Sequence, residues 1–449
     1  MLNKRGWLFV ALVAVAALVF ALFWWGARPR ETTTLTLLGE DTATMQAIES
    51  VKGEYETKRG VKIQCIKNTF EVLQQKANAD LASGTGLYDI ILNYNFSLSS
   101  FVRHGWVFTL RDLHEIDPRV GTSDFEKDIF PNIWKEVGFY KTSKDSEPQA
   151  IGYPFAGNTM LLVYNKKLFE DPRNQESYRA KYGHELSPPA SWAEFRQIAE
   201  FFTRPSEKTF GVVLEGAGGG WLYYEWINFA YSMGGGVMKK QFGWEGDVYT
   251  PLIIDSPETV AATKYYLGLR PYSAGDFLST GQNEQAELMR SGNIALAIMW
   301  SDVIYSLVHS PNGGRFGFSP IPGGKSQIGG GIYYFSKKSK QKKLAVDFVL
   351  FLMQKDTQRK LMEHGLCSPL RSAYDEPGVD KIPYAAALRQ ALEKGTYMAE
   401  AGPDADAVQE AVTLAVQRIA RGEVSAEEGL REARVNLERK RAEIFNLAK

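Results

Sequence analysis

Residues 32–41 read "TTTLTLLGED", and together with the segments that follow they decide the fold. Their alternation of polar and apolar residues predicts a β-strand that ends in an acidic, glycine-containing loop. Residues 42–60, "TATMQAIESVKGEYETKRG", predict a helix that stops at Gly60, and "VKIQCIK" (61–67) predicts a second strand. The folded part of the chain therefore begins as strand, helix, strand.

The next two segments continue this alternation. A helix is predicted over "VLQQKANADLASG" (72–84), and "LYDIILNYN" (87–95) has the apolar centre of a buried parallel strand. Strand, helix, strand, helix, strand is the start of a doubly wound α/β sheet, whose ligands sit beyond the carboxyl ends of the strands. Four polar residues at these ends are therefore candidate ligand contacts: Glu40, Asp41, Tyr94 and Asn95.

The composition limits the classes of function. The chain has 52 basic and 52 acidic residues, so its formal net charge is zero, whereas a nucleic-acid-binding protein needs a basic surface that neutralises phosphates. The five histidines are scattered, without an HExxH or CxxC motif, so we expect no metal site and no cofactor. At 449 residues, 44% of them hydrophobic, the chain can bury a large core.

The N-terminal segment has the length of a membrane span. Residues 7–25, "WLFVALVAVAALVFALFWW", contain no charge and no proline, and as a helix they would extend ~28 Å, the thickness of a bilayer core. A cleavage site needs a small residue where Trp25 stands, which favours an uncleaved anchor, but a cleaved signal stays open. In either case we expect residues 31–449 to be periplasmic or otherwise extracytoplasmic, tethered to the inner membrane if the segment is retained.

The two cysteines leave another alternative open. Cys65 and Cys367 could form one disulfide in an oxidising compartment. Each could instead serve as a small buried apolar residue, which is a common role of an unpaired cysteine.

An aromatic stretch at residues 221–231, "WLYYEWINFAY", raises a question about function. It follows the glycine-rich sequence "GAGGG" (216–220). Its positions with helical spacing are assigned to the core: Leu222, Trp226, Phe229 and Ala230. Four residues at the start of this predicted helix either join the core or face a ligand: Trp221, Tyr223, Tyr224 and Glu225.

Helix-end signals organise the downstream chain. Ser191 with Glu194 fits the spacing of a capping box, and Pro257 fits the first position of a helix. Residues 404–447 are predicted to form two helices that break near Gly422.

Five motifs occur in an order and spacing that resemble a known family. They are "YPFAGNTMLLVYNKKLF" (153–169), "PPASWAEFRQIAEFFT" (188–203), "AELMRSGNIALAIMWSDV" (286–303), "SPIPGGKSQIGGGIYYFSKKSKQKKLAVDFVLFLM" (319–353) and "HGLCSPLRSAY" (364–374). Together they resemble the family 1 extracellular solute-binding proteins of sugar-type ABC importers, the group that includes maltose-binding protein. The resemblance covers essentially all of residues 33–449, although the N-terminus looks like neither signal that is usual in the family.

The resemblance implies a two-lobed periplasmic-binding-protein fold of type II. This is an α/β fold in which each lobe is a doubly wound sheet, here preceded by an N-terminal hydrophobic helix. We expect a signal or membrane anchor in residues 1–30. The lobes are expected to divide the rest of the chain, with 31–152 and 318–362 in lobe 1 and 153–317 and 363–449 in lobe 2.

The resemblance also implies a function. The protein would be the substrate-binding component of an ABC importer and not an enzyme. It would bind a carbohydrate, such as an oligosaccharide or a sugar derivative, in the cleft between the lobes and deliver it to the permease subunits in the membrane. We expect it to act as a monomer.

The cleft of the family adds candidate residues. The apolar strand "IALAIMWSD" ends near Trp300, which the resemblance places at the border of the cleft. Asn158, in the hinge motif "PFAGN", matches a position where relatives have a ligand-binding polar group, with a turn as its alternative role. Gly330 and Gly331 could bring backbone N–H groups close to a ligand. Arg371 could hydrogen-bond a sugar or join an ion pair between the lobes.

Two alternatives remain open. A carbohydrate-active enzyme could use a pair of carboxylates such as Glu225 and Asp302, although no enzyme motif accompanies them. A membrane-tethered binding protein could instead take a non-sugar solute, such as a glycerol phosphodiester or a polyamine, or present its ligand to a sensor. A phosphodiester would need Arg and Lys in the cleft, and a polyamine several acids.

Overall fold

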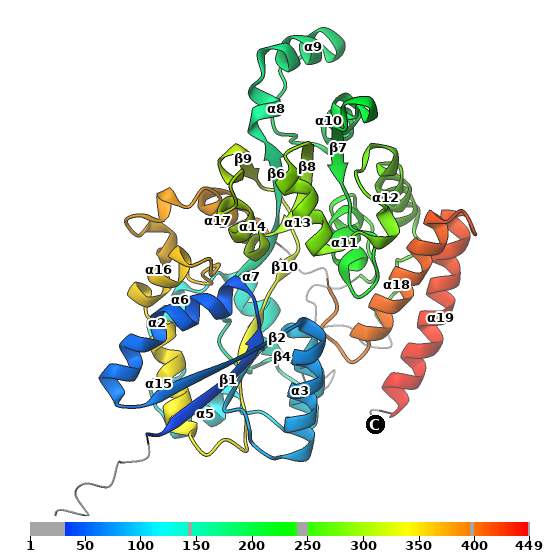
Figure 1. The fold of residues 1–449 in the computed structure, drawn as a ribbon. Coiled ribbons are helices and arrows are strands. Elements are labelled where there is room, and N and C mark those ends of the chain that lie inside the picture. Colours follow the sequence, from blue (N-terminus) through cyan, green and yellow to red (C-terminus); the bar gives the residue numbers. More distant parts are fainter. Residues whose placement is uncertain (1–31, 142–145, 240–249, 396–398, 448–449) are drawn as a thin grey trace, which may run out of the picture.

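Two β-sheets with helices packed around them form two lobes (Figure 1). The structure is a computed structural model that describes residues 32–141, 146–239, 250–395 and 399–447. The predicted anchor or signal, residues 7–25, lies outside these ranges. Over the described residues, no helix has both the length and the apolar character needed to cross a bilayer.

The first sheet confirms the strand and helix alternation predicted at the start of the chain. Its order is β11-β3-β1-β2. The three parallel strands are β1 (Thr34–Glu40), β2 (Lys62–Asn68) and β3 (Ile90–Tyr94), and β11 (Gly331–Phe335) pairs antiparallel with β3. The helices that connect the parallel strands are α2 (Ala43–Arg59) and α3 (Phe70–Ser83). Because the strands are parallel, their carboxyl ends lie along one edge of the sheet.

The second sheet is mixed. Its order is β10-β6-β8-β7, and β9 also pairs with β6. The strands are β6 (Asn158–Asn165), β7 (Phe210–Val213), β8 (Ile294–Trp300), β9 (Phe316–Ser319) and β10 (Ile328–Gly329). Strand β6 runs antiparallel to β8, β9 and β10, whereas β7 and β8 are parallel. The expected doubly wound arrangement therefore describes the parallel part of the first sheet better than it describes this one.

Two segments cross between the sheets side by side. Residues 153–158 lead into β6, and residues 328–333 lead from β10 into β11. The Phe155 N–H donates to the Gly331 carbonyl at 3.1 Å, and the Tyr333 N–H donates to the Tyr153 carbonyl at 3.0 Å. The division of the chain into lobes stays a prediction. Since β9 and β10 pair with the second sheet, we propose that the later crossing lies at Gly330 and not at residue 318.

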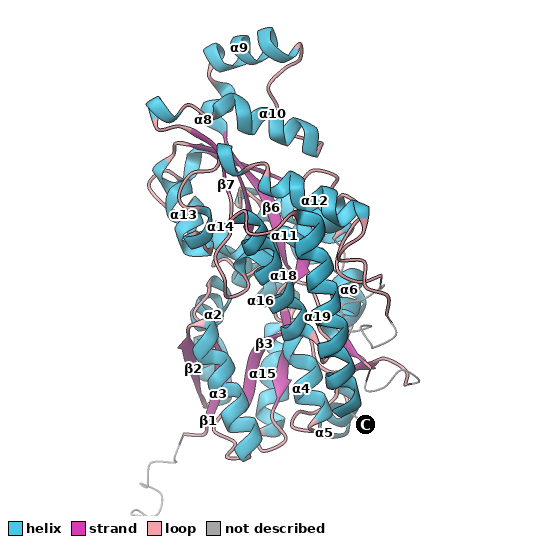
Figure 2. Cartoon of the chain, turned by 90° about the vertical axis from the view of Figure 1, so that its right-hand side faces the viewer, coloured by secondary structure: helices cyan, strands magenta, loops and turns pink. Residues whose placement is uncertain are grey.

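Helices pack around both sheets (Figures 1 and 2). Those beside the first sheet include α4 (Leu98–Arg103), α5 (Leu110–Ile116), α15 (Lys342–Leu352) and α16 (Lys355–Glu363). Those of the second lobe include α8 (Lys166–Glu170), α9 (Pro172–Tyr182), α10 (Trp192–Phe202), α11 (Trp221–Ser232), α12 (Pro257–Leu267), α13 (Gln282–Ser291), α14 (Ser301–Val308) and α17 (Ala385–Lys394). Before the first crossing, the chain also forms α6 (Phe125–Asp128), α7 (Pro131–Ile133), β4 (Phe139–Tyr140) and β5 (Gln149–Ala150).

The C-terminal helices α18 (Ala405–Ala420) and α19 (Ala426–Leu447) form the predicted hairpin, which breaks at Gly422. Figure 2 shows the hairpin running along the side of both lobes. Its buried apolar residues belong to the core of the second lobe. A groove separates the hairpin from α3 and α4 of the first lobe. Its lining on the hairpin side consists of Gly402, Pro403, Ala405, Asp406, Gln409 and Ile444.

Helix ends follow the local sequence signals. Gly60 ends α2 with a φ of 65°, and its N–H donates to the Glu56 carbonyl at 2.8 Å. Ser191 and Glu194 form the predicted capping box of α10, because each side chain accepts a hydrogen bond from the backbone N–H of the other. Pro257 is the first residue of α12, as predicted.

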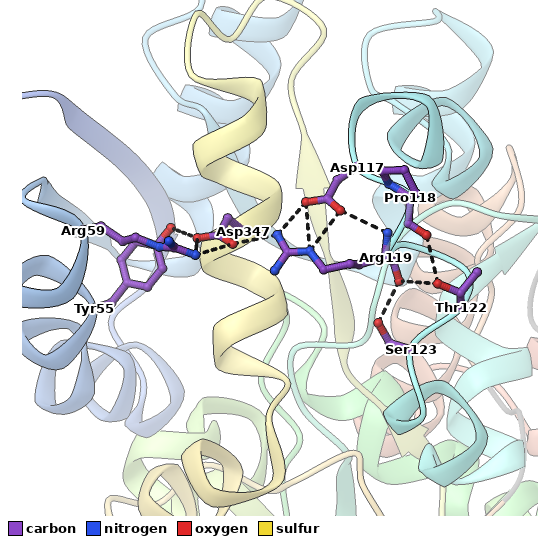
Figure 3. Close-up of polar contacts among 8 residues, drawn as sticks. All are labelled: Tyr55, Arg59, Asp117, Pro118, Arg119, Thr122, Ser123 and Asp347. Atoms are coloured by element: carbon purple, nitrogen blue, oxygen red, sulfur yellow. Dashed lines mark hydrogen bonds and ion pairs between the residues drawn. The ribbon is translucent and has the colours of Figure 1, made fainter.

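An ion-pair network fastens the helices of the first lobe (Figure 3). Asp347 on α15 accepts hydrogen bonds from the Tyr55 hydroxyl (2.8 Å) and the Arg59 guanidinium (2.8 Å), both on α2. Arg119 donates to Asp347 at 2.7 Å and is also paired with Asp117. Burial alone would raise the pKa of Asp347, but these donors lower it below its ordinary value. One carboxylate therefore joins α2, α15 and the loop that follows α5.

The two cysteines are not bridged in the structure. Cys65 is partly buried in β2, and Cys367 is fully buried, with its thiol donating to the Ser301 hydroxyl at 3.2 Å. Of the two alternatives, the structure agrees with small buried apolar residues.

Helix α11 carries the aromatic stretch, and most of it is core. Trp226 is 0% exposed, and its indole N–H donates to the Thr263 hydroxyl on α12 at 3.0 Å. The other residues assigned to the core by their helical spacing are also buried: Leu222, Phe229 and Ala230. These predictions are confirmed.

Two buried carboxyl groups meet behind α11. Glu225 is 0% exposed and accepts hydrogen bonds from three donors: the Glu215 backbone N–H (2.8 Å), the Tyr266 hydroxyl (2.8 Å) and Gln285 Nε2 (3.3 Å). The carboxyl oxygens of Glu215 have no hydrogen-bond partner among the described residues. Burial raises the pKa of both groups, and the Glu225 charge raises the pKa of Glu215 further. Both effects favour the neutral form of Glu215.

We expect Glu215→Gln to weaken the pH dependence of stability. A carboxyl group with a raised pKa in the folded state stabilises that state fully below its ordinary pKa of 4.5, and this contribution is lost as the pH rises through the raised value. The melting temperature of the unaltered protein should therefore fall between about pH 5 and about pH 8, and that of the variant should fall less. Scanning calorimetry at both pH values measures the difference.

Glu410→Gln is the matched control. Glu410 is exposed on α18, where its carboxylate lies 2.5 Å from Nζ of Lys440. This variant should show the same fall in melting temperature as the unaltered protein. An equal fall in all three proteins would contradict a neutral Glu215.

Candidate functional site

A pocket lies between the two lobes, at the edge where the strands of the first sheet end. Its lining encloses about 710 Å³ of empty space, which includes open solvent at its mouth. The first lobe contributes Glu40, Thr42, Phe70, Tyr94, Asn95 and Phe96. The other wall is formed by Asn158, Gly219, Trp221, Tyr224, Gln282, Trp300, Asp302, Gln327, Ile328, Gly329, Gly330 and Ala399.

Glu40 and Tyr94 meet at the carboxyl ends of two neighbouring strands. Since β1 and β3 are adjacent and parallel, their last residues lie close together, and the Tyr94 hydroxyl donates a hydrogen bond to the Glu40 carboxylate. Burial, and to a smaller extent the charge of Asp302, raises the pKa of Glu40 to about 7 against the lowering effect of Tyr94. Glu40 is therefore partly protonated near neutral pH.

Trp300 and Asp302 come from the opposite wall. As the sequence predicts, the apolar strand β8 ends at Trp300, and the chain turns directly into α14. Asp302 lies in the first turn of α14, where its Oδ1 accepts a hydrogen bond from the Val303 N–H at 3.0 Å. Burial raises the pKa of Asp302, and hydrogen bonds from Val303 and from the Asn158 side chain oppose this effect.

Aromatic side chains cover both walls of the pocket. On the first lobe, the Phe70 ring centroid lies 5.9 Å from that of Tyr94, and the rings of Tyr94 and Phe96 are stacked at 6.2 Å with an interplanar angle of 19°. On the second lobe, Tyr224 meets Trp300 edge to face at 6.1 Å. Trp221, the first residue of α11, lies on the same wall. A flat apolar ligand face could therefore be covered from both sides.

Two glycines shape the wall near Trp300. A Cβ atom on Gly329 would lie 2.4 Å from Cζ3 of Trp300, so only a residue without a side chain lets the indole lie against this backbone. Gly330 has a φ of 123°, a conformation in which other residues are strained. Gly330, one of the predicted ligand contacts, lines the pocket together with Gly329.

Two amide side chains at the pocket have polar atoms without a protein partner. Asn95 is 6% exposed and Asn158 is 4% exposed. Among the described residues, Nδ2 of Asn95 donates no hydrogen bond, and Oδ1 of Asn158 accepts none. One is a donor and the other an acceptor, so together they suit a ligand with hydroxyl groups.

Five of the predicted site residues lie outside the pocket lining: Asp41, Tyr223, Glu225, Gly331 and Arg371. Asp41 is exposed, with its carboxylate 3.7 Å from Nζ of Lys67. Gly331 lies within β11, and the exposed Arg371 places its guanidinium 5.8 Å from the Phe130 ring. Ligand contact by these residues stays a prediction that the pocket geometry does not support.

The register of α11 explains which of its aromatic residues reach the pocket. Trp221 and Tyr224 are three residues apart and share one face of the helix, and both line the pocket. Tyr223 and Glu225 point to other faces and are buried inside the second lobe. The carboxyl pair Glu225 and Asp302, considered for an enzyme, is therefore not assembled in one pocket.

Eight further lining residues had no place in the sequence prediction: Thr42, Phe70, Phe96, Gly219, Gln282, Gln327, Ile328 and Ala399. Phe70 follows the end of β2 by two residues, and Phe96 follows the end of β3 by two. The rule that sites lie beyond the carboxyl ends of strands could have found both. Gln282 starts α13 and carries no comparable signal.

The arrangement suits reversible binding of a small molecule. Its two carboxyl groups, its amides and its aromatic faces all turn toward one pocket. Within the described ranges, no group of three or more His, Cys, Asp or Glu side chains is placed to hold a metal ion.

Comparisons with known proteins agree with this geometry. The fold is similar to that of a solute-binding protein of an ABC transporter from Agrobacterium radiobacter K84 in complex with ribitol, with a TM-score of 0.76 and 22% identity over 92% of this chain and 100% of that chain. It is also similar to an ABC transporter solute-binding protein from Thermotoga lettingae TMO bound with alpha-D-tagatose, with a TM-score of 0.74 and 20% identity over 91% and 99% of the two chains. A maltose-bound protein of T. maritima has a TM-score of 0.72 and 17% identity over 92% and 99%.

These structures share the two-lobed α/β fold with this chain. Among curated proteins, no sequence matches it significantly. The family described as bacterial extracellular solute-binding protein matches residues 39–359, which include both crossings and most of the pocket. The chain therefore belongs to the family of bacterial extracellular solute-binding proteins.

Proposed function

We propose that the protein is the substrate-binding component of an ABC importer, which captures a carbohydrate or polyol between its lobes and delivers it to membrane permease subunits. The observation that carries this proposal is the pocket, with aromatic faces on both walls and the unpartnered amide atoms of Asn95 and Asn158. A sugar has an apolar C–H face and a rim of hydroxyl groups, which match these two kinds of side chain.

The ligands of structurally similar proteins support the choice of ligand class. The structures named above hold ribitol, alpha-D-tagatose and maltose, and a further one from Agrobacterium vitis S4 holds D-mannitol. All four ligands are neutral and rich in hydroxyl groups.

The charge of the pocket disfavours a glycerol phosphodiester. A phosphodiester requires cationic side chains, and no Lys, Arg or His is found among the described residues that line the pocket. The proposal also includes an extracytoplasmic location, a monomeric protein and residues 7–25 as a membrane tether. The uncharged, bilayer-length sequence of that segment supports the tether.

A ligand screen tests the proposal directly. The full-length chain is mixed with a panel of sugars and polyols that includes ribitol, mannitol, tagatose and maltose, and its melting temperature is measured. A compound at one hundred times its Kd stabilises the folded state by about 2.7 kcal/mol, so a true ligand should raise the melting temperature clearly. If no sugar or polyol does so, and calorimetry detects no binding, the proposal fails.

Removal of pocket aromatics should weaken binding without unfolding the protein. We expect Trp300→Ala, and at least one of Trp221→Ala and Tyr224→Ala, to raise the Kd of the cognate sugar at least about tenfold, because a stacked ring contributes about 1–3 kcal/mol. The melting temperature without ligand should stay within a few degrees, since these side chains are only partly buried. Calorimetric titration and thermal melts separate the two effects.

Trp226→Ala is the contrasting variant. Its indole is fully buried against α12, so its removal should cost about 3–5 kcal/mol of stability. The affinity of the remaining folded protein should not change. If all the pocket variants lower stability and keep their affinity, the aromatic residues are structural and the sugar binds elsewhere.

The N-terminal segment should remain on the mature protein. Because residues 7–25 match the bilayer and lack a small residue at the cleavage position, we expect the protein to fractionate with membranes and to keep Trp7–Trp25. Intact-mass measurement of protein purified from its native host checks this. A new N-terminus between about residues 22 and 34 would show that the segment is a cleaved signal.

A further inference from the structure

The pocket contains two carboxyl groups and no cationic side chain to pair with them among its described lining residues. Glu40 from the first lobe and Asp302 from the second line the same space, and no cationic side chain accompanies them among the described lining residues. Apart from Tyr94, the groups that act on the Glu40 carboxyl are themselves acids: Asp302, Glu71 and Asp41. A neutral ligand that closed this pocket would bring two carboxyl groups together without a partner of opposite charge.

Lys67, a cation near this edge of the first sheet, pairs with acids outside the pocket. Lys67, on β2, lies 2.8 Å from the Glu49 carboxylate and 3.7 Å from that of Asp41. It does not line the pocket. On the second lobe, Asp406 at the start of α18 adds a further negative charge near Tyr224. Neither Lys67 nor Asp406 therefore neutralises the carboxyl groups that line the pocket.

The aromatic walls add a second, independent feature. Phe70, Tyr94 and Phe96 face the space from one lobe, and Trp221, Tyr224 and Trp300 from the other. The face of an aromatic ring carries negative electrostatic potential, and several such faces around one space attract a cation, Trp most strongly. Carboxylates and aromatic faces together form a site for an ammonium group.

We propose that the ligand of this pocket carries a protonated amino group on a polyhydroxylated skeleton, as an amino sugar or an amino polyol does. This rests on the proposed carbohydrate function and narrows its ligand class. The ammonium group binds between Asp302 and Glu40 against the aromatic faces. The amides of Asn95 and Asn158 hydrogen-bond the ligand hydroxyl groups. Because one carboxyl comes from each lobe, the ammonium also draws the two lobes together.

The proposal is tested with sets of probes that share one skeleton. Within a set, the probes differ only in whether the same position carries an amine, a hydroxyl or an acetamide. One set is glucosamine, glucose and N-acetylglucosamine; a second is 1-amino-1-deoxysorbitol and sorbitol; a third is the disaccharide of glucosamine, cellobiose and diacetylchitobiose. Calorimetric titration of the full-length chain at neutral pH gives each Kd. We expect the amine of at least one set to bind at least about tenfold more tightly than its neutral counterparts.

Two variants locate the origin of this preference. Asp302→Asn and Glu40→Gln keep the shape of each side chain and remove its charge. Each should reduce the preference for the amine, measured as the ratio of the Kd values of the neutral probe and the amine in the same variant, at least about fivefold. Thermal melts without ligand verify folding, and two variants on different lobes keep the test valid if one is unstable.

Glu54→Gln is the matched control for net charge. Glu54 is exposed on α2, pairs with Lys360 at 2.7 Å and does not line the pocket, so the variant should keep the full preference for the amine. Three outcomes overturn the proposal: neutral probes that bind as tightly as amines, a preference that survives both pocket variants, or a preference that Glu54→Gln also removes. If neutral sugars bind in any of these cases, the proposed importer function still holds. If neither the amines nor the neutral probes bind, that function is contradicted as well.

Discussion

The pairing of two crossing segments, residues 153–158 and 328–333, is the constraint on which the rest of the structure depends. Each segment passes from one sheet to the other, and backbone hydrogen bonds tie the two together at the point of passage. The same segments form part of the pocket wall, through Asn158, Gly329 and Gly330. The relative position of the lobes and the shape of the pocket are therefore set by one piece of backbone. A change in the hinge is also a change in the site.

Much of this arrangement follows from short-range rules that a sequence displays. Parallel strands that end at one edge predict that Glu40, Tyr94 and Asn95 lie together, and they do. Periodicity alone identifies Trp226 as core, because an apolar residue at helical spacing faces the neighbouring helices. The spacing cannot show which remaining face of α11 meets the pocket, since that depends on where α12 and α18 pack. The sequence therefore could not show that Trp221 and Tyr224 line the pocket whereas Tyr223 and Glu225 are buried in the core.

The buried acids differ in what surrounds them, and their roles differ accordingly. Asp347 is held by two arginines and a tyrosine and stays ionised, so it acts as a fastener between helices. Glu225 has three neutral donors, and Glu215 has none on its carboxyl group, which makes their pair sensitive to protons. Glu40 and Asp302 have no cationic side chain beside them among the described residues that line the pocket between the lobes. The same side-chain type thus joins helices at Asp347, responds to protons at Glu215 and Glu225, and lines the ligand pocket at Glu40 and Asp302.

The direction of β1 has a consequence for the orientation of the whole molecule. The strand runs from Thr34 to Glu40, so at ~3.3 Å per residue its start lies about 20 Å from the pocket, at the base of the first lobe. Any chain that precedes residue 32 joins the body at this base. The N-terminal connection and the pocket therefore lie at opposite ends of β1, so whatever precedes residue 32 joins the first lobe away from its ligand site.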